Sequence, residues 1–319
     1  MIVFASILTD IELPRRDEKG QPADHLATRR LMTLASTLEK ITPSLMNWLV
    51  IRAIEKSMRK SYPTLKPEWN LLPAPPPTHS TPIVNDDLIP LLASGSVTNV
   101  PGISKISKDG AVMMTDGSIL EGIDAVILCT GYQPSFSILD TSIDPTTSPT
   151  PEYDEAPYGS SVRRYVRLYQ GIFSPQYPES LAFIGPYPII SAFTGADVVS
   201  QAIAQVFSAK YKLPSQQGID EWCDDHYNWS VEQARIARAP AGFIKGAEIE
   251  HWLNDACGNG LNEKLGWGLE GWKFWWEERE LWNLIMNGVN TGFIYRLFDG
   301  RRKSWAGAKD AIMKANIRA

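Results

Sequence analysis

The sequence predicts an α/β fold with parallel-sheet elements, and three observations support this prediction. Two are the short apolar runs AVILC (Ala125–Cys129) and LAFIGP (Leu181–Pro186), each followed by turn residues. Such runs are typical of strands buried on both faces of a parallel sheet. The third is a set of apolar stripes at three- and four-residue spacing, which indicate amphipathic helices.

Length and composition set limits on the class of protein. A chain of 319 residues has room for about two domains, and 44% hydrophobic with 21% charged residues is typical of a globular protein. The net charge of −5 and the lack of a basic stripe argue against nucleic-acid binding. The three scattered cysteines fit a reducing, cytoplasmic compartment, and without CxxC or clustered histidines we expect no metal site.

The first third of the chain predicts one strand and two helices. MIVFASIL is too short to span a membrane and lacks the features of a signal peptide, so a strand is expected. Residues 24–60 carry two helical stripes that are separated at Pro43. LLPAPPPTHSTP then predicts a stiff, extended connector.

Strand-like segments follow, and then helices. Short runs from Ile83 to Cys129 predict strands, with a hairpin at Asp116–Gly117. Residues 140–161 predict a loop, and the last third is helical. The helix after LAFIGP is expected to bury one stripe, made of Val198, Val199, Ala202, Ile203, Val206 and Phe207.

The segment EGIDAVILCTGYQPSF resembles the flavin-containing monooxygenase family. Members carry a strand that ends in Ala-Thr-Gly-Tyr at the hinge between their NADPH and FAD domains, and Cys129–Tyr132 reads Cys-Thr-Gly-Tyr. Further segments resemble the family in its own order: PIVNDDL, DGSILEGID, LYQGIFSP, LAFIGP, KLPS and GRRKSWAGAKDAI. We expect the buried Cys129 thiol to be inert.

Three motifs of that family are missing from this sequence. They are a GxGxxG turn for FAD that follows an apolar strand, the FxGxxxHxxx[F/Y] fingerprint and the second Gly-rich turn for NADPH. The Gly-rich stretch 258–271 follows no apolar strand and predicts a surface loop. The resemblance therefore implies an incomplete chain: residues 1–132 as the second half of the NADPH domain with a helical insertion at about 24–60, residues 133–215 as the returning part of the FAD domain, and residues 216–319 as a helical, Trp-rich extension.

The resemblance also implies a Rossmann-like flavoprotein that uses FAD, NADPH and molecular oxygen. A flavin hydroperoxide would oxygenate a soft nucleophile, an amine nitrogen or a sulfide sulfur, while the protein positions the cofactor and excludes water. Two alternatives stay open. The chain could be a non-catalytic relic or a subunit that needs a separately encoded half, or it could be a Baeyer–Villiger-type enzyme that acts on ketones.

The expected cofactor-binding residues lie in three places. Thr130, Gly131 and Tyr132 would form the hinge, where glycine allows close approach of a backbone or ligand. Gly185 and Pro186 follow the second strand. The turn into the next helix would direct N–H groups at the flavin, through Thr194, Gly195, Ala196, Asp197 and Gln201. The alternative is an ordinary helix cap at Thr194 or Asp197. No catalytic residue is identified.

Two helical regions are candidates for contact with a membrane surface. The stretch 267–285 is rich in tryptophan, and a buried structural helix is the expected explanation, with an interfacial membrane helix as the alternative. The helices at 31–58 carry Lys and Arg on their polar side and are the better candidates for peripheral membrane contact. His226 and His251 are expected to be surface or core histidines rather than ligands.

Overall fold

The computed structural model describes most of the chain. The described residues are 2–5, 12–13, 15–16, 22, 25, 28–73, 83–127, 135–159, 164–185, 192–236, 244 and 246–317. They form two compact units, of which the first comprises Met1–Asp24 with Thr37–Tyr132, and the second His25–Ser36 with Gln133–Ala319. Helix α1 (Arg29–Ile41) contributes residues to both units.

The first unit contains short strands and a few helices. β1 (Ile2–Ala5) pairs in parallel with β4 (Val97–Val100), and β2 (Glu12–Leu13) pairs in parallel with β3 (Ile83–Val84). Its helical elements are α2 (Pro43–Ser61), the 3-10 helix η2 (Pro67–Trp69) and α3 (Leu88–Ala93). The predicted parallel pairing and the amino-terminal strand are therefore present.

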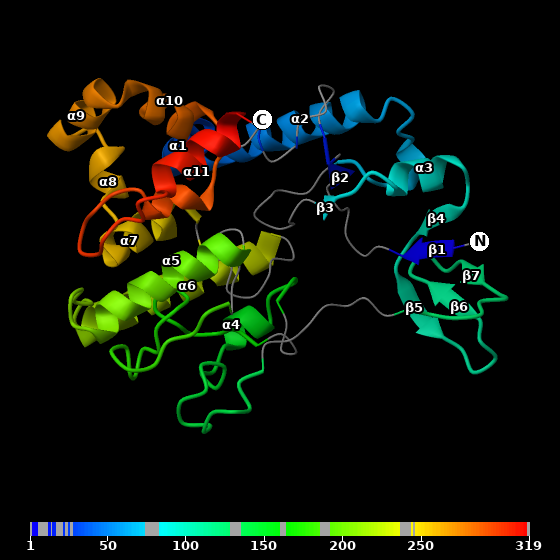
Figure 1. Cartoon of the computed structure of the whole chain (residues 1–319). Coiled ribbons are helices and arrows are strands. Elements are labelled where there is room, and N and C mark those ends of the chain that lie inside the picture. Colours follow the sequence, from blue (N-terminus) through cyan, green and yellow to red (C-terminus); the bar gives the residue numbers. More distant parts are fainter. Residues whose placement is uncertain are drawn as a thin grey trace. The chain divides into compact units, whose positions relative to one another are not determined.

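An antiparallel sheet completes this unit. β5 (Ile103–Ile106), β6 (Val112–Met114) and β7 (Ile119–Leu120) lie side by side in that order (Figure 1). The hairpin predicted at Asp116–Gly117 joins β6 to β7, and Gly117 adopts the positive φ of 84° that such a turn needs. The Asp116 carboxylate accepts hydrogen bonds from both the N–H and the hydroxyl of Ser118, which closes the turn.

Local signals place the boundaries of α1 and α2. The Thr28 hydroxyl accepts a hydrogen bond from the Leu31 N–H, which caps the start of α1. Pro43 occupies the first turn of α2, where its missing N–H costs nothing. Met58 on α2 is fully buried, and it packs in a small core with Trp69, Leu71, Ile89, Leu92 and Val97.

The second unit is mainly helical. Its elements are α4 (Pro151–Asp154), α5 (Ala192–Phe207), α6 (Gln216–Ile236), α7 (Gly246–Cys257), α8 (Leu261–Lys264), α9 (Leu269–Glu277), α10 (Arg279–Asn287), the 3-10 helix η3 (Gly292–Arg296) and α11 (Ala308–Ile317). One large hydrophobic core joins all of them except α4, with Phe173, Val198, Leu253, Ile285 and Ile312 among its fully or almost fully buried members, whereas α4 packs through Tyr153 in a smaller cluster with Tyr165 and α6. The predicted helical last third is confirmed.

Two predicted strands differ from the structure. Glu121–Ile127 are not in a strand, and Ile127 is 85% exposed, while Leu128 and Cys129 lie outside the described residues. Leu181–Ile184 form only an isolated bridge, between Phe173 and Ala182. An apolar run becomes a strand only when neighbouring strands complete its hydrogen bonds, and in the described part of the chain neither run has such neighbours.

The tryptophan-rich stretch also differs from its prediction. α9 buries Gly271 and Phe274, whereas Trp267, Trp272 and Trp276 are exposed. The stretch predicted as a surface loop includes helix α8, and its Leu261 is buried. The predicted helical stripe of α5 is buried at Val198, Val199, Ala202 and Val206, whereas Ile203 is partly buried and Phe207 is exposed at the end of the helix.

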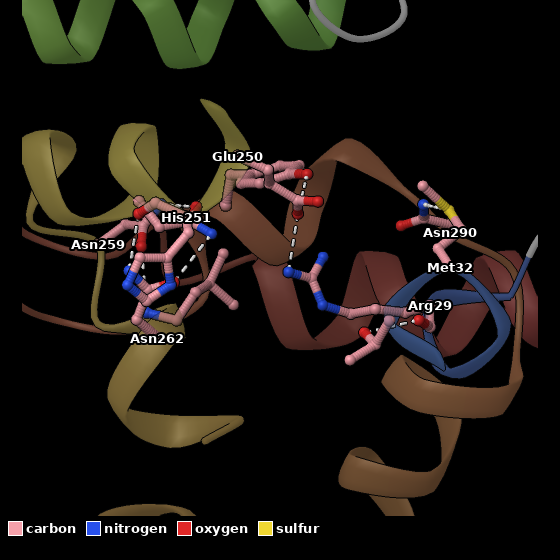
Figure 2. A network of polar contacts seen from close by, with 11 residues as sticks. Arg29, Met32, Glu250, His251, Asn259, Asn262 and Asn290 are labelled. Carbon is pink, nitrogen blue, oxygen red and sulfur yellow. Dashed lines mark hydrogen bonds and ion pairs between the residues drawn. The ribbon is translucent and has the colours of Figure 1, made fainter. Parts of the chain in front are cut away.

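Polar contacts fix the first turn of α1 to other parts of the second unit. The Arg29 Nη2 donates to Glu250 Oε1 over 2.8 Å, and the Tyr295 hydroxyl donates to the same oxygen over 2.9 Å. Figure 2 shows Arg29 directed at Glu250, with Asn290 beside Met32 one turn further along α1. In the part of the chain that the structure describes, no helix is long and apolar enough to cross a membrane.

Candidate functional site

The candidate site is built on the first turns of α5. Thr194, Gly195, Ala196 and Asp197, which were expected to form a turn before the helix, lie within it because the helix already begins at Ala192. Gly195 is buried and Ala196 is exposed, whereas Thr194 and Asp197 are half-buried. Neither Thr194 nor Asp197 is the residue that precedes the helix, so the predicted simple cap is not what these residues form.

Asp197 is instead the centre of a cluster of polar contacts. Arg296, from the end of η3, pairs with both carboxylate oxygens, with Arg296 Nε 3.0 Å from Asp197 Oδ2 and Nη2 bonded to Oδ1. The Gln201 amide nitrogen, one turn along α5, also donates to Oδ2 over 3.0 Å. This bidentate ion pair raises the pKa of Arg296 and connects α5 to a residue that lies 99 positions away in the sequence.

Arg302 and Cys257 lie close enough to this cluster to interact with it electrostatically. Burial, followed by repulsion from Arg296, lowers the pKa of Arg302. The Cys257 thiol donates to the Val198 carbonyl oxygen over 3.1 Å, and burial raises its pKa to about 12. The thiol is therefore protonated at neutral pH and serves packing rather than nucleophilic chemistry.

The segment before η3 packs closely on the same turn of α5. A Cβ placed on Gly292 would lie 2.7 Å from the Thr194 hydroxyl oxygen, so any larger residue there would force the Thr194 side chain to move. The Thr291 hydroxyl and the Gln201 Oε1 are buried and have no hydrogen-bond partner among the described residues. These two polar atoms can therefore bond a ligand group that reaches them.

The remaining predicted site residues are not brought into this cluster. Gly185 has a φ of 92° in a turn, and no atom lies within 4 Å of where its Cβ would be. Thr130, Gly131, Tyr132 and Pro186 lie outside the described residues. Sequence reasoning missed Arg296, Arg302 and Cys257, because nothing in their spacing links them to α5.

The chemistry available to this site is binding and positioning. It offers helix N–H groups, one amide, hydroxyls and guanidinium groups, but its only thiol is held in the neutral form. Among the residues that the structure describes, no group of three or more His, Cys, Asp and Glu is placed to hold a metal ion. His226 is stacked between Trp222 and Trp229, and His251 is exposed.

Comparison with known proteins identifies the class. The sequence profile of the family described as "Flavin-binding monooxygenase-like" matches residues 5–319. The chain therefore belongs to this family of flavoprotein oxidoreductases, whose members depend on FAD and NADPH. The mixed helix and sheet composition agrees with an α/β flavoprotein.

Individual relatives show which monooxygenases the chain is similar to. Monooxygenase aurF of Gibberella zeae is 35% identical over 299 residues, which cover 93% of this chain and 56% of the relative. Flavin-containing monooxygenase 5 of mouse is 31% identical over 64% of this chain and 34% of the relative, and human flavin-containing monooxygenase 3 is 26% identical over 63% and 34%. The chain thus spans about half, or less, of the length of these curated relatives.

Among solved structures, an S-allyl-L-cysteine S-oxygenase from Allium sativum is similar to part of the chain. It shares 24% sequence identity, with a TM-score of 0.39, over 50% of this chain and 34% of that one.

Proposed function

We propose that this chain takes part in FAD- and NADPH-dependent oxygenation of a soft nucleophile, an amine nitrogen or a sulfide sulfur. The observation that carries the proposal is the set of contacts that holds the first turns of α5 in place. Asp197, held by Arg296 and Gln201, fixes the position of these turns, and Thr194 packs against Gly292. Membership of a flavin-binding family supports a flavin as the group that this helix meets.

The residues present fit such a group. A flavin offers hydrogen-bond donors and acceptors on one edge of its ring, and Gln201 Oε1 is a buried acceptor without a partner in the described part of the chain. The first N–H groups of α5 carry the positive end of the helix dipole, which favours an electron-rich ring edge. When bound, FAD reduced by NADPH supplies the oxygen-transfer chemistry, and the role of this chain is to orient it and exclude water.

We assign residues 1–132 to an NADPH-binding domain, with residues 133–215 and a helical extension at 216–319 belonging to the FAD side. The two parallel pairs, β1 with β4 and β2 with β3, support a Rossmann-like sheet in the first of these segments. Thr130, Gly131 and Tyr132 would form the hinge. The two described cysteines, Cys223 and Cys257, are free and buried, which supports a cytoplasmic, reducing compartment.

The experiment is to measure flavin content and NADPH consumption. Because the one GxGxxG pattern in this sequence, Gly266–Gly271, follows helix α8 and not a strand, we expect the chain alone to purify colourless, and we expect FAD after co-expression with the part of the aurF relative that this chain does not cover. Sulfide, tertiary amine and cyclic ketone substrates then separate the proposed reaction from Baeyer–Villiger oxidation. Gln201→Ala should lower the FAD content, whereas Gln217→Ala, on the exposed side of α6, should not.

Two results would contradict the proposal. If the co-expressed pair stays colourless, the chain does not contribute to a flavin site. If the pair holds FAD and Gln201→Ala binds it as well as the parent, then α5 does not meet the flavin in the way proposed.

We also propose peripheral contact of α1 and α2 with an anionic membrane surface. Residues 30–61, which leave out the Glu250-paired Arg29, contain six basic and two acidic residues, a net charge of +4 in a chain of net charge −5. Large apolar side chains are exposed along the same helices, namely those of Leu31, Leu34, Ile41, Leu45, Trp48 and Leu49. Apolar and basic side chains on one helix favour the interface of an anionic bilayer.

Vesicle sedimentation tests this contact. The chain should bind phosphatidylserine-containing vesicles more tightly than pure phosphatidylcholine vesicles, and Trp48→Ser should weaken binding. Ile138→Ser is the control, because Ile138 is exposed elsewhere in the chain. Equal sedimentation of the parent and Trp48→Ser chains would contradict the proposal.

A further inference from the structure

Arg302 has a guanidinium group that the described protein satisfies only in part. Its Nη1 donates to the Lys303 carbonyl oxygen over 2.8 Å. The Nε and Nη2 atoms are shielded from water, yet they have no hydrogen-bond partner among the described residues. A shielded cationic donor without a partner is costly, because it has lost its hydration and gained nothing in return.

The nearby carboxylates are engaged elsewhere. Asp197 accepts bidentate hydrogen bonds from Arg296, and Asp299 accepts a hydrogen bond from the Ser304 N–H over 2.7 Å. In the described chain no carboxylate lies within ion-pairing distance of Arg302. Arg296 adds a second positive charge nearby and Asp197 and Asp299 offset these charges, so what calls for an anion is the pair of unpartnered Nε and Nη2 donors.

The position of Arg302 is nevertheless reachable from solvent. The residue as a whole is only half-buried, although two of its nitrogen atoms are shielded. A small movement of the side chain would therefore expose its planar fork of donors. This fork matches the paired oxygens of phosphate and carboxylate groups.

We propose that Arg302 binds an oxyanion, a phosphate or carboxylate group, next to the Asp197–Arg296 pair. The anion supplies the missing hydrogen-bond partner of the Nε and Nη2 donors. The inference does not depend on the oxygenase function, because it concerns the charge of this chain alone. A dinucleotide phosphate and a free inorganic anion are two sources of the same chemistry.

The test is anion-dependent thermal unfolding of the chain, followed by tryptophan fluorescence at constant ionic strength in chloride. The probes are inorganic phosphate, pyrophosphate, acetate, FAD and NADP⁺, and the chains are the parent, Arg302→Gln, Arg302→Lys and Lys303→Gln. Lys303 is the matched control because it is the exposed neighbour with the same charge. Binding to the folded chain raises its unfolding temperature in proportion to occupancy.

We expect at least one anion to raise the unfolding temperature of the parent and of Lys303→Gln. Arg302→Gln should bind this anion about tenfold or more weakly, with Arg302→Lys in between because a lysine keeps the charge without the fork. Without anion, Arg302→Gln should unfold at the same or a higher temperature, since an unpaired charge has been removed.

The pattern of anions identifies the source. Stabilisation by phosphate or pyrophosphate alone supports a site for free anions, and stabilisation only by FAD or NADP⁺ supports a dinucleotide phosphate. A parent chain that none of the anions stabilises overturns the proposal. So does equal affinity in the parent and both Arg302 variants, or an equal loss in Lys303→Gln.

Discussion

Replacing Glu250 by Gln keeps the shape of the side chain but removes the negative charge that Arg29 and Tyr295 share. The Arg29 side chain is 14% exposed and that of Glu250 is 25% exposed, while Tyr295 is 4% exposed. Burial by itself lowers the pKa of Arg29, but attraction to Glu250 and to Tyr295 outweighs it, and the net shift is upward. The arginine therefore stays charged in the variant and loses its counter-charge.

The expected cost follows from these contacts. A hydrogen bond to a charged group contributes about 1.5–3 kcal/mol, and breaking a fully buried pair costs about 3–5 kcal/mol. Because Glu250 is a quarter exposed, we expect Glu250→Gln to lower the free energy of unfolding by about 2–3 kcal/mol. Tyr295→Phe removes one hydrogen bond to the charged Glu250 carboxylate and should cost about 1.5–3 kcal/mol.

The assay is urea unfolding followed by tryptophan fluorescence, since nine of the eleven tryptophans lie in the second unit and report on it. Glu270→Gln is the control, because Lys264 and Glu270 form an ion pair of similar length at the surface. Adding Arg29→Met to Glu250→Gln should recover part of the lost stability, because no buried charge is then left unpaired. If Glu250→Gln is no more destabilising than Glu270→Gln, the cluster in Figure 2 does not stabilise the fold as described.

Three further predictions concern pH and packing. Burial raises the pKa of the Cys223 and Cys257 thiols to about 12, above their unfolded pKa of 9.0. The stability that each thiol contributes is therefore complete below pH 9 and falls by about 1.4 kcal/mol per pH unit between pH 9 and pH 12. In urea unfolding from pH 8 to 11, the free energy of unfolding should fall less steeply with pH for Cys257→Ala than for the parent chain. Gly300→Ala should lower the free energy of unfolding by about 2 kcal/mol or more, because its Cβ would lie 2.0 Å from a backbone carbonyl oxygen. Gly268→Ala is the control, because no atom lies within 4 Å of its Cβ position. Equal urea midpoints of the two variants would contradict this prediction. Met58→Ala should destabilise the first unit by about 3 kcal/mol in urea unfolding followed by far-ultraviolet circular dichroism, and an unchanged midpoint would exclude Met58 from its core.

Local sequence signals predicted the parts of this fold that depend on adjacent residues. Pro43 separates two helices, and Asp116–Gly117 forms a hairpin, because proline and glycine restrict or permit particular backbone angles wherever they occur. The order of short motifs also predicted the family, which the profile match over residues 5–319 confirms. The cofactor class follows from that membership.

Patterns that depend on distant neighbours were predicted less well. Ile127 was expected in a buried strand but is exposed, and the aromatic stripe of α9 leaves Trp272 and Trp276 exposed. An apolar side chain favours burial, but it is buried only where the fold packs another helix, strand or loop against it. No local pattern contains that information.

The sequence by itself thus determined the main helices, the hairpin and the family. Only the tertiary structure decided that Asp197 is paired with Arg296, that Gly292 packs on Thr194 and that two nitrogen atoms of Arg302 lack a hydrogen-bond partner among the described residues. The reason is physical: backbone conformation responds to neighbours along the chain, whereas pairing and burial of charges depend on which residues packing brings together from a hundred positions apart.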